Sequence, residues 1–185
     1  KNIFEEPANN IKNSRAVTGK VTIYIDIKSQ HVTPEKTSNL CWAFSVCHIG
    51  DTVTNITGVT PISIAQDYFD STSPSVYNWG VYTDEIPSIF SKHYDLDTTY
   101  KTSPLSFSKV KSNINAEKPI YTEWRAGKNG HAMVLLGYGD DNAICLGDSN
   151  IGNWKWLLPG TSNGTDWVYS NGGGNHTWTY TVTLD

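Results

Sequence analysis

The stretch Cys41-Trp42-Ala43-Phe44-Ser45 opens the longest helical pattern in the chain. Apolar side chains recur through this pattern at near-helical spacing, which predicts a helix over 40–57 with Ser38 and Asn39 as capping candidates. Peptide dipoles and unpaired amides at the start of a helix stabilise an anion, so this position favours a thiolate at Cys41. Cys41 is therefore a candidate nucleophile, and the alternative is a small buried thiol in the core.

The rest of the chain divides into helical and strand-like patterns. Further helices are predicted over 61–69, 84–94 and 107–116, the first of them with Thr60 as N-cap and Pro61 at its first position. Strands are predicted over 21–27, 120–124, 131–138, 143–146 and 177–184, with a flexible loop over 170–175. A strand, then helices, then several strands indicates an α+β fold with a helical half and a sheet half.

Length and charge restrict the classes of function. A chain of 185 residues and 20.5 kDa fits one domain over 1–185. With 14 basic and 18 acidic residues its net charge is −4, which disfavours nucleic acids and anionic membranes as partners. No apolar run approaches the roughly 20 residues that cross a bilayer. The start at Lys1, the single Met and the many hydroxyl side chains fit a secreted, extracellular protein from which a leader or pro-segment has been removed.

Two motifs carry a resemblance to a known family. The stretch 41–45 resembles the nucleophile helix of papain-like cysteine peptidases, in which an aromatic and a small residue follow the cysteine. Residues 130–138, Gly-His-Ala-Met-Val-Leu-Leu-Gly-Tyr, resemble the histidine strand of the same superfamily. The resemblance spans about 24–148 and is similar to compact bacterial members such as staphopains and bacteriocin-leader peptidases. It implies a papain-like α+β fold in which the helix with Cys41 packs on an antiparallel sheet.

Of the five histidines, His131 is the predicted base. His48 lies two turns along the same helix as Cys41, roughly 10 Å away, too far for direct proton transfer. The remaining three have no paired orienting group in the sequence and are interpreted as solvated residues: His31, His93 and His176.

The hairpin after His131 supplies an orienting residue. A two-residue turn at Asp140-Asp141 gives a register in which His131 faces Asn150 and Met133 faces Asp148, all on one face of the sheet. A shift of two residues would place Asp148 opposite His131. The family resemblance favours Asp148 as the third residue, with Asn150 in reserve. The alternative is that Asp148 caps its own turn.

The resemblance also implies two donors for the oxygen that becomes charged: the Cys41 N–H and a Gln side chain upstream. The usual family spacing of six residues falls on Glu35, which cannot donate when ionised. Gln30 lies 11 residues upstream, and an insertion at about 31–35 that loops out would reconcile the two. We assign Gln30.

The other two cysteines are predicted to be core thiols. A bond between Cys47 and Cys145 would leave Cys41 free. No Cys/His spacing resembles a zinc site, and the resemblance implies no metal or organic cofactor. Trp154 and Trp156 are candidates to shield the His131 pair from water, and aromatic packing alone explains them equally well.

These residues predict a thiol hydrolase. Cys41 attacks a peptide carbonyl, His131 transfers the proton, Asp148 orients His131, Gln30 polarises the oxygen, and water resolves the acyl-enzyme. The expected partners are a protein or peptide substrate and an inhibitory pro-segment or inhibitor protein, with the chain as a monomer.

Two alternatives stay open. The same triad can catalyse deamidation or transamidation. A papain-like scaffold without turnover could instead bind a peptide in an aromatic cleft, and the Gln30 spacing supports that possibility. The presence of Cys41, His131 and Asp148 together argues against it.

Overall fold

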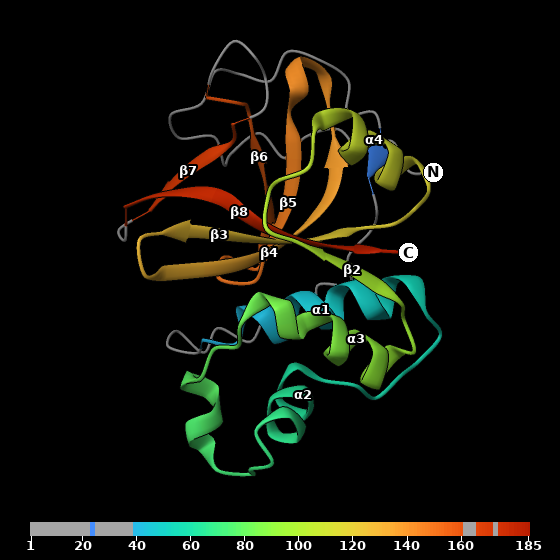
Figure 1. Cartoon of the computed structure of the whole chain (residues 1–185), viewed down its shortest axis with the longest axis vertical. Coiled ribbons are helices and arrows are strands. Elements are labelled where there is room, and N and C mark those ends of the chain that lie inside the picture. The colour runs from blue at the N-terminus through green and yellow to red at the C-terminus, as the bar shows by residue number, and fades with distance from the viewer. Residues whose placement is uncertain (1–22, 25–38, 161–165, 172–173) are drawn as a thin grey trace.

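A helical half packs against a sheet half in this chain, as the α+β prediction requires (Figure 1). The structure is a computed structural model that describes residues 23–24, 39–160, 166–171 and 174–185. The single domain over 1–185 stays a prediction. No helix in the described ranges is long and apolar enough to cross a membrane.

The helical half precedes most of the sheet in the chain. Its α-helices and short 3-10 helices are α1 (Cys41–Val53), α2 (Pro61–Tyr68), η2 (Pro74–Asn78), η3 (Thr83–Glu85) and α3 (Ile86–Tyr94), and α4 (Phe107–Asn115) follows on the far side of the sheet. The capping box between Thr60 and Ser63 fixes the start of α2, with Pro61 at its first position as predicted.

The helix with Cys41 is shorter than predicted, and its capping differs. It ends at Val53, because the Thr54 hydroxyl donates to the Gly50 carbonyl at 2.8 Å and the backbone turns extended there. Its N-cap residue is Leu40, and no side chain among the described residues caps the start of the helix. The side chain of Asn39 donates instead to the Asn78 carbonyl at 2.8 Å, so the capping role predicted for it is wrong. Ser38 lies outside the described residues.

The described strands form one eight-stranded antiparallel sheet. The main path runs β2-β8-β3-β4-β5-β6, with β1 beside β4 and β7 beside β8. Their bounds are β1 (Ile23–Tyr24), β2 (Thr98–Lys101), β3 (Ile120–Ala126), β4 (Asn129–Tyr138), β5 (Ile144–Asp148), β6 (Asn153–Leu157), β7 (Val168–Asn171) and β8 (Gly174–Leu184). The loop predicted over 170–175 is wrong at both ends, because Ser170 pairs with Asn175 in the β7–β8 hairpin.

The two faces of the sheet pack against different helices. Along β4, Ala132, Val134 and Leu136 join the core with α1, whereas Met133 and Leu135 join the core with α4. This alternation follows from the two-residue period of a strand. One face of β4 therefore meets the helix that carries Cys41.

The β4–β5 hairpin differs from its predicted turn but keeps the predicted register where His131 lies. The turn has three residues, 140–142, and closes with a 3.0 Å hydrogen bond from the Gly139 N–H to the Ala143 carbonyl. An irregularity at Leu136 takes up the extra residue, so Leu135 pairs with Leu146 as the two-residue turn would have required.

Candidate active site

Cys41 is the first residue of α1 and faces the sheet half. The backbone N–H of Ala132, in β4, donates to its Sγ at 3.4 Å. The first amides of α1 have no partner inside the helix, and the N-cap residue, Leu40, offers them no side-chain acceptor. The Cys41 sulfur and N–H therefore lie in an electropositive position at the contact between the two halves.

His131 and Asp148 form a buried pair next to this sulfur. Nε2 of His131 lies 2.7 Å from Oδ1 of Asp148, and the residues are 6% and 4% exposed. Since Asp148 occupies Nε2, Nδ1 is the ring nitrogen left for Cys41. The Asn150 side-chain amide lies 3.5 Å from Nδ1, a marginal contact.

The site favours the protonated form of His131. Burial alone lowers the pKa of His131, but hydrogen bonds to Asp148 and Cys41 and the charges of both outweigh burial and raise the pKa to about 9. For Asp148, burial raises the pKa, but contact with His131 and Lys155 brings it well below its usual value. At neutral pH the pair is therefore an imidazolium beside a carboxylate.

The Asp148 carboxylate has three hydrogen-bond donors. Oδ1 accepts from His131 and from the Asn150 backbone N–H at 3.0 Å, and Oδ2 accepts from Lys155 Nζ at 2.6 Å. The turn role that the sequence left open for Asp148 coexists with its contact to His131. Asn150, the reserve candidate, supports the carboxylate through its backbone.

Sequence reasoning missed Lys155, although the β5–β6 register contains a signal for it. Asp148 pairs with Asn153 and Leu146 with Lys155, which makes Lys155 a diagonal neighbour of Asp148 on the same face. Trp154 and Trp156, the predicted shields, pack instead on the core with α1. The aromatic residue near the pair is Tyr169, whose ring centroid lies 6.4 Å from that of His131.

The other cysteines behave as core thiols. All three cysteines are free, so Cys47 and Cys145 are not bonded to each other. Burial raises the pKa of Cys47 to about 12 and raises that of Cys145 well above its ordinary value. Neither thiol is ionised near neutral pH.

Two histidines expected to be solvated have partners. His93 lies 3.1 Å from Asp67, and His176 is 3% exposed and stacks on Tyr169 with ring centroids 4.7 Å apart. Their sequence neighbours do not reveal these contacts, because each partner lies on another element. His48 is buried on α1, and His31 lies outside the described residues.

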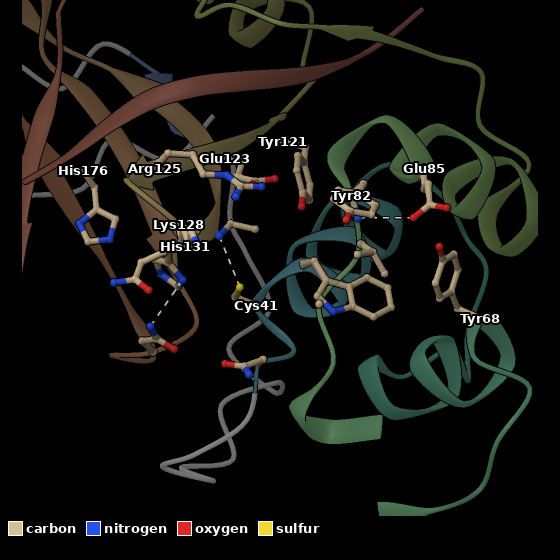
Figure 2. A pocket seen from close by; sticks show the side chains of 18 of the residues that line it. Cys41, Tyr68, Tyr82, Glu85, Tyr121, Glu123, Arg125, Lys128, His131 and His176 are labelled. Atoms are coloured by element: carbon tan, nitrogen blue, oxygen red, sulfur yellow. Dashed lines mark hydrogen bonds and ion pairs between the residues drawn. The ribbon is translucent and has the colours of Figure 1, made fainter. Parts of the chain in front are cut away.

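A cleft of about 1020 Å³ runs past Cys41 (Figure 2). Figure 2 shows His131 on one side of Cys41 and an aromatic group on the other, which includes Tyr68 and Tyr82 with Glu85 between them. The remaining aromatic lining residues are Trp42, Phe69 and Tyr121.

A buried polar group joins the two halves in the wall of the cleft. Thr83, in η3, donates to Glu123, in β3, and Glu123 forms an ion pair with Arg125. Burial raises the pKa of Glu123, and Arg125 offsets part of this effect. Sequence reasoning also missed this contact.

Gln30, the predicted oxyanion donor, lies outside the described residues, so its role stays a prediction. The described residues hold no group of three or more His, Cys, Asp or Glu side chains that could bind a metal ion.

A family model for the Peptidase C39 like family matches residues 22–171. The chain belongs to the peptidase C39-like family. The family resemblance to papain-like cysteine peptidases is thereby confirmed. The matched region contains Cys41, His131 and Asp148, the three residues described above.

Solved structures show the same fold for this C39-like chain. A Bacillus anthracis protein, provisionally described as a C39-like peptidase, superposes with a TM-score of 0.50 at 13% identity. The match covers 86% of this chain and 96% of that one. At this identity the likeness shows the fold alone. No curated protein matches the chain.

Proposed function

We propose that this member of the peptidase C39-like family hydrolyses peptide bonds through Cys41, His131 and Asp148. The observation that carries the proposal is the contact of the Cys41 sulfur with β4 at 3.4 Å, next to a histidine bonded at 2.7 Å to a buried carboxylate. A nucleophile, a base within its reach and a third group that orients the base form the pattern of covalent acyl transfer.

The first half of the reaction forms a thioester. The Cys41 thiolate attacks the carbonyl carbon, and the π electrons of the carbonyl move to oxygen, where the Cys41 N–H donates to the developing charge. The imidazolium of His131 gives its Nδ1 proton to the amide nitrogen. The C–N bond then breaks, the amine leaves, and His131 is neutral.

The second half restores the site. Neutral His131 takes a proton from water as the water oxygen attacks the thioester carbon. The C–S bond breaks, the acid leaves, and Cys41 returns as thiolate beside the imidazolium. Asp148 stays ionised throughout and stabilises the cationic form of His131.

Water and an amine would compete for the same thioester, which is the chemical basis of the transamidase alternative. Deamidation differs only in that the amide attacked lies in a glutamine or asparagine side chain. A binding module would not need a carboxylate that is 4% exposed and carries three donors, because burial of such a charge costs free energy.

The test is hydrolysis of an unstructured peptide library by the whole chain in ¹⁸O-labelled water, read by mass spectrometry. We expect new C-termini that carry ¹⁸O in the wild type and none in Cys41→Ala. Products joined to an added amine would indicate transamidation, and ¹⁸O confined to side-chain carboxylates would indicate deamidation. Intact peptides in every sample would favour the binding module.

Secretion, a bacterial source, a monomeric state and an inhibitory pro-segment or inhibitor protein stay predictions of the sequence.

A further inference from the structure

We propose that Lys155 is a positioning residue for the reaction: its ammonium group holds Oδ2 of Asp148 so that Oδ1 stays directed at His131. The inference rests on the proposed function, because its readout is the reactivity of the pair formed by His131 and Cys41. Lys155 itself touches neither the sulfur nor the imidazole in any contact that the described residues make.

The hydrogen-bond donors to Asp148 are divided between its two carboxylate oxygens. The two donors on Oδ1 come from His131 and the Asn150 backbone, whereas Lys155 is the donor on Oδ2 at 2.6 Å. A carboxylate fixed by donors on both oxygens cannot rotate without breaking a charge-assisted hydrogen bond. Such bonds are stronger than hydrogen bonds between neutral groups. Loss of Lys155 would free Oδ2.

The ammonium group of Lys155 is also held by its surroundings. Nζ of Lys155 lies 4.1 Å from the centre of the Tyr169 ring, and its side chain is 20% exposed. The Tyr169 hydroxyl is buried without a hydrogen-bond partner among the described residues. Tyr169 therefore contacts Lys155 through the π face of its ring and not through its hydroxyl. The amine is thus held from two sides, by a carboxylate and by an aromatic ring.

The register of the sheet places Lys155 and His131 on either side of Asp148. Asp148 has diagonal neighbours on both sides of β5: Lys155 on β6 and, when the β4–β5 register is continued by one pair, His131 on β4. Because all three lie on one face, two cations share a single carboxylate. A lysine in this place therefore acts on the site through Asp148.

The acid side of the pH profile separates this role from a purely structural one. The titratable groups that face Asp148 from the packed elements are His131 (β4), Lys155 (β6) and Tyr169 (β7). Behind them, His176 (β8) stacks on Tyr169, and Cys41 (α1) lies beside His131. Of these, Lys155 and His131 are the cations that hold Asp148 ionised. Without Lys155 the carboxylate takes up a proton at higher pH, and the imidazolium loses its partner there.

The experiment compares kcat, KM and the rate of Cys41 alkylation by iodoacetamide between pH 2 and 10 for the whole chain, because the Asp148 carboxylate takes up its proton well below the usual pH. For Lys155→Met we expect kcat to fall about tenfold with little change in KM, and the acid limb to move up by about 1 pH unit, as the loss of one charged hydrogen bond implies. Lys155→Arg should restore most of both. Lys111→Met is the matched control, because it removes one exposed amine near Phe107 and should change neither.

Tyr169 supplies a second pair of variants in case Lys155→Met does not fold, which circular dichroism would show. Tyr169→Phe keeps the ring and should behave as wild type, whereas Tyr169→Leu should move the acid limb in the same direction by a smaller amount. The proposal is overturned if Lys155→Met keeps the wild-type acid limb, or if Lys155→Arg shifts as far as Lys155→Met. With Lys155→Met unfolded, an unshifted Tyr169→Leu overturns it.

Failure of the proposed function would look different. A wild-type chain that hydrolyses no peptide but alkylates at Cys41 in a His131-dependent way would overturn the peptidase proposal. The alkylation profile would then still decide the role of Lys155.

Discussion

The backbone N–H of Ala132 donates to the sulfur of Cys41 across 3.4 Å, which joins the first residue of α1 to β4 of the sheet. Because His131 is the residue before Ala132, this contact sets the sulfur beside the imidazole.

Alkylation of the folded chain should be selective. Near pH 7, iodoacetamide should label Cys41 fast and Cys47 and Cys145 at least 100-fold more slowly, since burial suppresses their thiolates. Peptide mapping by mass gives the rates. In His131→Ala the fast phase should disappear, and in urea all three cysteines should react alike. Equal labelling of all three in the folded wild type would contradict the assignment.

Activity should fall on the alkaline side with an apparent pKa of about 9. His131 keeps its proton below that pH, so the imidazolium that protonates the leaving amine is present at neutral pH and is lost above it. In Asp148→Asn the limb should move down by about 1 to 2 units, because the stabilising charge is removed. The profile of kcat/KM against pH measures both. An alkaline limb that stays in place in Asp148→Asn would argue against the pairing.

The two candidates for the third residue should differ in size of effect. Asp148→Ala removes the partner of Nε2 and should lower kcat/KM by about 100-fold or more. Asn150→Ala keeps the backbone N–H that donates to Asp148 and loses only a 3.5 Å side-chain contact, so the loss should stay below about tenfold. Steady-state kinetics on one peptide compares them. A larger loss in Asn150→Ala would reverse the assignment.

Gly50 should tolerate no side chain. A Cβ at this position of α1 would collide with the ring of Tyr94, which is buried and donates to Asp51 at 3.0 Å. Gly50→Ala should therefore lower the free energy of unfolding by about 1 to 3 kcal/mol. Gly80→Ala, where nothing lies within 4 Å of the added carbon, should be nearly neutral. Urea unfolding of both variants provides the measurement, and equal midpoints would show that Tyr94 moves freely.

The sequence predicted the fold class because the period of its apolar residues changes from helical to alternating near Pro119. Helix starts were predicted where a local cap exists, as at Thr60, and the end of α1 was not, because it depends on a side-chain bond from Thr54 back to Gly50. The turn predicted between β4 and β5 is one residue shorter than the turn in the structure. The compensating irregularity at Leu136 has no signature in the sequence.

In the candidate site, too, residues in local motifs were predicted and residues brought in by packing were not. Cys41 and His131 were predicted from short motifs, and Asp148 from the hairpin register together with the family resemblance. Lys155 and Tyr169 were missed, because their role arises from the register of β6 and from the packing of β7, which joins the sheet late in the chain. Contacts between elements that are distant in sequence leave no local pattern.

Since the sulfur belongs to the helical half and its hydrogen-bond donor to the sheet half, the chemical reactivity of one atom reports on the interface between them. A mutation or solvent that separates α1 from β4 by even an ångström or two would lower the reaction rate of the Cys41 thiol while both halves keep their secondary structure. Loss of the fast labelling at Cys41 would then precede any change in circular dichroism, so the labelling rate of this cysteine reports how firmly the two halves are joined.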